Sequence, residues 1–157
     1  MSTDHNSPAV AFLLEQLAKQ QAAVFQPVGR NTGIDLAVRA RDGQYVELVC
    51  LQGTPEAPRA FKVRRFRRRP NLIMACIVVA NDGALEETWL IPSGVFERFG
   101  SLEPDGGCVL DLDSDTQDPV HERLAVYRER WALITDFTRY RSTLEDPLAL
   151  QVRIAMG

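Results

Sequence analysis

Apolar residues follow a helical pattern at the start of the chain and strand-like patterns after it. Ser7-Pro8 is a cap followed by a first-turn proline, and the apolar spacing that follows predicts a helix from about Pro8 to Gln21. A short strand is predicted over Val24–Val28, before a turn that ends at Gly33. The apolar stripe of the helix comprises Val10, Leu13, Leu14 and Leu17.

The middle of the chain holds the strongest strand signal. Leu72–Ala80 is apolar throughout and rich in β-branched residues, as is typical of a central strand buried on both faces. Thr88–Ile91 returns as another strand, and a short helix begins at Pro92-Ser93. We expect Ser93 to cap that helix rather than to act as a nucleophile, because no His and Asp pattern accompanies it.

Two further strands, Ile34–Ala40 and Tyr45–Leu51, lie on either side of Arg41-Asp42-Gly43 and predict a β-hairpin. A two-residue loop would set polar residues opposite apolar ones. A three-residue loop, with Gly43 in a left-handed conformation, places apolar pairs on one face. We therefore choose the three-residue loop, with these pairs: Ala40 with Gln44, Val38 with Val46, Leu36 with Leu48, and Ile34 with Cys50.

The chosen register has a chemical consequence on the other face of the hairpin. Asp35 would lie directly opposite Val49 and diagonal to Glu47, and diagonal neighbours are about 7–8 Å apart. Two carboxylates at that spacing can converge on one ion. Hard cations such as magnesium take oxygen ligands, and such an ion stabilises the charge that develops in phosphodiester cleavage. Asp35 and Glu47 are therefore the candidate metal ligands.

The C-terminal third is predicted to be mostly helical. A second long helix begins at Asp118-Pro119, and Tyr127 and Trp131 on its apolar stripe are expected to be core contacts or contacts within a homodimer. Residues 147–155 alternate as in a strand but suit a helix almost as well. The element order predicts one α/β domain with a single mixed sheet, an N-terminal helix and a helical C-terminal extension. Its parts are a core over 8–100, an acidic loop over 101–118 and the extension over 119–157.

Charge is unevenly distributed, although the 157 residues carry a formal net charge of only -3. The segment Glu103 to Asp118 is acidic and contains no base. A basic run precedes it, and arginine suits phosphate binding through its planar fork. Phe61 and Phe66 interleave with the cations and could stack on bases of DNA or RNA. The alternative is that the run balances the acidic segment. The cations are Arg59, Lys62, Arg64, Arg65, Arg67, Arg68 and Arg69.

Several classes of protein are excluded or disfavoured. No apolar run reaches the roughly 18 residues of a membrane helix, and the N-terminus has no secretory pattern. The 3 cysteines have no paired spacing, which favours a reducing cytoplasm and buried, apolar roles. With 2 histidines, a zinc site is disfavoured.

At the hairpin the sequence resembles the PD-(D/E)XK nuclease superfamily, which includes restriction-endonuclease-like and Holliday-junction-resolvase-like proteins. The matching segments are Gly33-Ile34-Asp35-Leu36 and Tyr45-Val46-Glu47-Leu48-Val49. The resemblance implies an Asp on one strand, Glu-x-Lys on the next, and often a Glu on the preceding helix, here Glu15. It covers roughly residues 8–100 and implies a restriction-endonuclease-like core with a magnesium-dependent carboxylate site.

The sequence departs from that pattern at the lysine. Residue 49 is Val, which carries no charge and donates no hydrogen bond. Lys62 and Gln52 are the candidate replacements for the lysine, but Lys62 must fold back onto the carboxylate face and Gln52 has the wrong strand parity unless the strand bulges. Catalytic candidates are thus Asp35, Glu47, Lys62 and Glu15.

Three functional hypotheses follow. The first is a catalytically degenerate nuclease-like protein that binds nucleic acid or a protein partner, and it is the one we favour. The second is an active magnesium-dependent nuclease with a displaced lysine. The third is a structural or interaction module in which the carboxylates are incidental. An ion bound between Asp35 and Glu47 would separate the first two hypotheses from the third.

Overall fold

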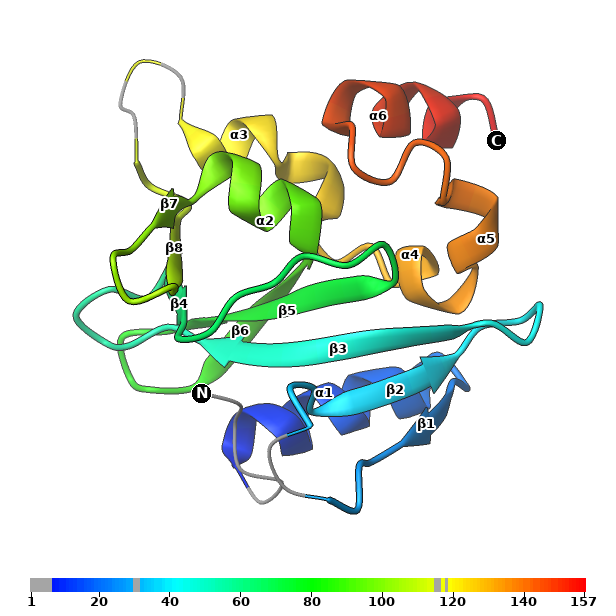
Figure 1. The fold of residues 1–157 in the computed structure, drawn as a ribbon, viewed down its shortest axis with the longest axis horizontal. Helices are drawn as coiled ribbons and strands as arrows, with labels where there is room; N and C mark the ends of the chain where they lie inside the picture. Colours follow the sequence, from blue (N-terminus) through cyan, green and yellow to red (C-terminus); the bar gives the residue numbers. More distant parts are fainter. Residues whose placement is uncertain (1–6, 30–31, 115–116, 118) are drawn as a thin grey trace.

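The structure is a computed structural model that describes residues 7–29, 32–114, 117 and 119–157 (Figure 1). Helix α1 (Pro8–Lys19) begins as predicted, with the Ser7 side chain accepting a hydrogen bond from the Val10 N–H at 3.1 Å. Its apolar stripe is buried against the sheet and contacts β1 and β3.

A five-stranded mixed sheet forms the centre of the fold, in the order β1-β2-β3-β5-β6. Strands β3 and β5 are parallel, and the other neighbours are antiparallel. The prediction of a mixed α/β fold with an N-terminal helix is confirmed, and β5 is buried along its whole length as expected for a central strand. The strands are β1 (Ala23–Phe25), β2 (Leu36–Arg39), β3 (Tyr45–Gln52), β5 (Leu72–Val79) and β6 (Leu85–Pro92).

A second sheet of three short strands, in the order β4-β8-β7, is not predicted by the sequence pattern. The segment predicted as an acidic loop contains two of these strands, so it is a hairpin for much of its length. Helix α2 (Ser93–Phe99) leads directly into it. The strands are β4 (Ala60–Val63), β7 (Ser101–Leu102) and β8 (Cys108–Asp111).

The parallel pairing of β3 and β5 determines where the basic run lies. Parallel neighbours need a crossover connection, because the chain must return to the starting edge before the second strand begins. Here β4 and residues 64–71 make that return without a helix. Figure 1 shows this segment crossing back along β5 on the side of the sheet that carries α2, opposite α1.

The prediction of one long C-terminal helix is wrong. The described part of that region consists of short helical pieces, and the second is separated from the third by Arg128, which is extended, and Glu129, which has a φ of 53°. The backbone N–H of Glu129 donates to the Thr88 carbonyl at 2.8 Å, and the Glu129 side chain accepts from the Thr88 N–H. Pairing with the open edge of β6 thus replaces helical hydrogen bonds. The predicted start at Asp118 lies outside the described residues. The pieces are α3 (Val120–Arg123), η1 (Ala125–Tyr127), α4 (Ala132–Thr135) and α5 (Phe137–Tyr140).

The C-terminal segment left open by the sequence is a helix, α6 (Pro147–Ala155). Asp146 caps it through a hydrogen bond from the Ala149 N–H, and Pro147 occupies the first turn. Its Leu150 is buried, whereas Leu148 and Val152 are exposed. Among the described residues, no helix has both the length and the apolar character needed to cross a membrane.

Candidate nucleic-acid interface

The hairpin has the three-residue loop that the sequence predicts. Ala40 N–H donates to the Gln44 carbonyl at 2.7 Å, and Gly43 has a φ of 90°. Strands β2 and β3 pair Leu36 with Leu48 and Val38 with Val46. The register prediction is therefore confirmed for the body of the hairpin.

The ladder between β2 and β3 begins at Leu36, directly after Asp35. The predicted pairs of Asp35 with Val49 and of Ile34 with Cys50 are therefore not part of it. The N–H of Asp35 donates to the Leu48 carbonyl at 2.8 Å, and its Oδ2 accepts from the Cys50 N–H at 2.8 Å. The Asp35 carboxylate thus accepts a hydrogen bond from a strand N–H that would otherwise donate to a backbone carbonyl. Asp35 is only 1% exposed. Burial, together with the Asp35 charge, raises the pKa of the Cys50 thiol to about 12.

Glu47 lies next to Leu72 of β5 and is half-buried. Its Oε1 forms an ion pair with a guanidinium nitrogen of Arg69 at 2.9 Å. Arg69 itself is held through its backbone by Ser93, whose buried Oγ accepts from the Arg69 N–H and donates to the Arg69 carbonyl, each at 2.8 Å. Ser93 is therefore not the helix cap that the sequence predicts, since Pro92 occupies that position. It anchors the basic segment to α2.

A pocket of about 750 Å³ lies between this segment and the sheet. Val49 and Met74 are neighbours in the β3–β5 register and contribute to one wall. The crossover segment contributes arginines and Phe66, which also stacks on Phe96 of α2 at a ring distance of 5.6 Å. The lining residues are Thr32, Gly33, Val49, Val63, Arg64, Arg65, Phe66, Arg67, Arg69, Leu72 and Met74.

The basic run divides into paired and unpaired cations. Lys62 contacts Glu103 at 2.9 Å, Arg59 contacts Asp113 at 3.5 Å and Arg68 contacts Glu97 at 3.6 Å. Arg59 and Lys62 thus form ion pairs with the acidic segment, as the alternative interpretation of the basic run predicts. Three arginines that line the pocket have no ion pair with any residue that the structure describes: Arg64, Arg65 and Arg67.

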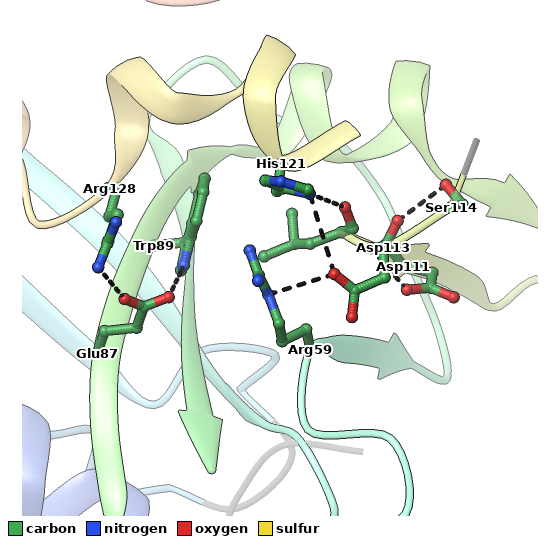
Figure 2. A network of polar contacts seen from close by, with 9 residues as sticks. Arg59, Glu87, Trp89, Asp111, Asp113, Ser114, His121 and Arg128 are labelled. Atoms are coloured by element: carbon green, nitrogen blue, oxygen red, sulfur yellow. Dashed lines mark hydrogen bonds and ion pairs between the residues drawn. The ribbon is translucent and has the colours of Figure 1, made fainter. Parts of the chain in front are cut away.

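Arg59 belongs to a separate polar network on the β6 side of the molecule (Figure 2). Asp113 forms an ion pair with Arg59 at 3.5 Å and lies 3.9 Å from His121. Beside it, Glu87 binds Arg128 at 2.6 Å and the Trp89 indole N–H at 2.9 Å. Arg59 and Lys62 do not line the pocket, so they do not extend its basic wall.

The other predicted site residues lie away from the pocket. Glu15 is exposed and pairs with Lys19 on the same helix at 3.8 Å. Lys62 lies on β4, where its hydrogen bond to Glu103 raises the pKa of the lysine. Phe61 is fully buried, so Phe66 is the interleaved aromatic that reaches the pocket. Cys50, Cys76 and Cys108 are buried free thiols, as expected.

The residues present do not fit a magnesium ion well. The Asp35 carboxylate already accepts a strand N–H, and the Glu47 carboxylate already has a guanidinium as its counter-ion. Where the motif lysine would lie, Val49 is 4% exposed and apolar. Within the described ranges, no three His, Cys, Asp or Glu side chains come together as a metal-binding group.

Comparison with known proteins supports the fold. No family model matches the chain, and no curated protein matches it. Among solved structures, the chain is similar to a bacterial homing endonuclease, I-Ssp6803I, with a TM-score of 0.56 and 19% sequence identity. The match covers 85% of this chain and 92% of that one. The chain therefore has a nuclease-like fold, while the finer resemblance to the PD-(D/E)XK superfamily stays a prediction.

Proposed function

We propose that this chain binds the backbone of DNA or RNA at the arginine-lined pocket and that its carboxylate centre is catalytically degenerate. The observation that carries the proposal is the placement of Arg64, Arg65 and Arg67 around the pocket without an ion-pair partner in the described part of the chain. Phosphate is a ligand that guanidinium groups bind well, through paired hydrogen bonds. The nuclease-like fold supports nucleic acid as the source of that phosphate.

The arginine segment is held in place before any ligand binds. Phe66 N–H donates to the Gly106 carbonyl at 3.2 Å, and Ser93 holds Arg69 at the other end. Gly107 lies so close to this segment that a Cβ there would be 2.9 Å from the Val63 carbonyl oxygen. A fixed segment loses less conformational entropy when a ligand binds, which favours affinity.

Catalytic degeneracy is supported by the missing motif lysine and by the ion pairs that two candidate catalytic groups already form within the protein. Val49 replaces the lysine, Lys62 pairs with Glu103, and Arg69 is the counter-ion of Glu47. A lysine that helps to position or activate water would need to reach the carboxylates. None of the described lysines lines the pocket.

The test is a binding titration with fluorescently labelled oligonucleotides over a range of salt concentrations. We expect affinity to fall steeply with salt, with a slope of roughly 0.9 per phosphate contact on duplex DNA. The double variant Arg64→Ala/Arg67→Ala should weaken binding to all sequences about equally and reduce the slope by about 1 to 2.

A charge-matched control is Arg41→Ala/Arg153→Ala, which removes two cations that do not line the pocket. It should bind almost as the unmodified protein does. Equal losses in both double variants would show that net charge, not the pocket, governs binding. No retention of DNA or RNA by the unmodified protein at low salt would refute the proposed function.

A further inference from the structure

We infer that the pocket selects an unpaired nucleotide, with the base stacked on Phe66 above an apolar floor and the phosphate on its arginines. This inference rests on the proposed function and deepens it, because it specifies single-stranded or locally unpaired nucleic acid as the ligand. A site that only follows a duplex backbone needs cations along a surface. It does not need an apolar recess beneath them.

The apolar wall is built from adjacent strands of the central sheet. Val49 of β3 lies beside Met74 of β5 in the register. Leu72, two residues before Met74 on β5, lies on the same face of the sheet. All three are at most 5% exposed, so they form a packed floor beneath the recess and leave its accessible sides to Phe66 and the arginines. The substitution of valine for the motif lysine is what makes this floor apolar at residue 49.

Phe66 gives the recess an aromatic side. Its ring stacks on Phe96, and it is half-buried while still lining the pocket. Aromatic side chains bind bases by stacking, with little dependence on sequence, because every base has a π-face. The cations Arg65 and Arg67 come directly before and after Phe66, so phosphate contacts would lie next to a stacked base.

The pocket volume suits a nucleotide. At about 750 Å³ it lies within the roughly 300–1,000 Å³ that is typical of small-ligand sites. A base inside a duplex presents only its edges in the grooves, so it must leave the stack to reach such a recess. Extrusion requires the base to be unstacked and unpaired, and this cost is absent in single strands. The site should therefore prefer single-stranded to duplex nucleic acid.

The experiment compares three labelled oligonucleotides of equal length at one salt concentration: a single strand, its duplex, and a single strand made of abasic sites. We expect the intact single strand to bind most tightly. The variant Phe66→Leu keeps an apolar group against Phe96 but removes the ring. It should weaken single-strand binding between about 5-fold and about 150-fold, the range for loss of one base–aromatic stack.

The controls separate stacking from folding and from charge. Phe66→Trp keeps a ring and should restore tight binding, whereas Phe25→Leu, at an exposed aromatic on β1 that does not line the pocket, should have no effect. Phe66→Leu should leave the salt slope unchanged. If the duplex or the abasic strand binds as tightly as the intact strand, the inference fails while the proposed function stands. If none of the three is retained, both fail.

Discussion

At the scale of single residues, Gly43 has the backbone conformation on which the hairpin depends. Its φ of 90° is rarely adopted by other residues, and a β-branched side chain resists it most. Gly43→Val should lower the free energy of unfolding by about 1–3 kcal/mol, measured by urea denaturation. Gly43→Asn should cost less, because Asn tolerates positive φ better. Equal stabilities for the Val variant and the unmodified protein would contradict the turn geometry.

The ion pair of Glu47 with Arg69 gives a second prediction at this scale. If Arg69 is already neutralised by Glu47, removing the carboxylate charge should free the guanidinium for phosphate. Glu47→Gln should therefore tighten nucleic-acid binding by up to about fivefold, since exposed or half-exposed pairs are worth about 0.2–1 kcal/mol.

The matched control for that prediction is Glu97→Gln. Glu97 pairs with Arg68, which does not line the pocket, so binding should change little. A metal-binding Glu47 gives the opposite result, because its replacement would weaken any binding that depends on magnesium. Titrations with magnesium and with a chelator distinguish the two outcomes.

At the scale of elements, the sequence pattern predicts those strands and turns whose structure depends on neighbouring residues in the chain. The turn at Arg41-Asp42-Gly43 and the alternation on either side of it define the register of β2 and β3, and the apolar run identifies β5. The prediction of a long helix after Asp118 is wrong because the contacts that interrupt the helix come from residues far away in the sequence. Thr88 and Glu129 exchange hydrogen bonds across 41 residues of sequence, and the helical period carries no sign of them.

The site was predicted less completely than the fold for the same reason. Arg69 was expected to bind phosphate, but its pairing with Glu47 depends on the parallel alignment of β3 and β5. Ser93 is predicted as a cap because serine at the start of a helix is a preferred capping residue. Its contacts with the Arg69 backbone join segments 24 residues apart. The small sheet that positions Lys62 against Glu103 follows from pairing of β4 with β8, two short strands with weak individual signals.

At the scale of the whole molecule, the proposed catalytic degeneracy depends on several elements acting together. The fold brings the arginine segment over the same face as Glu47 and Val49, which is where the resemblance to nucleases implies chemistry. In that place the structure supplies cations and an apolar wall, while the carboxylates have partners within the protein. This arrangement supports our proposal that the chain binds a ligand without hydrolysing it.

We therefore expect no detectable cleavage of DNA or RNA with magnesium or manganese at neutral pH, in single-strand or duplex form. Cleavage is measured by gel electrophoresis at protein concentrations that saturate binding, so that weak affinity cannot hide activity. Asp35→Ala, purified in parallel, reports any contaminating nuclease. Metal-stimulated cleavage that disappears in Asp35→Ala would establish an active enzyme. The loss of that activity in Lys62→Ala, with folding unchanged, would then identify Lys62 as the displaced catalytic group.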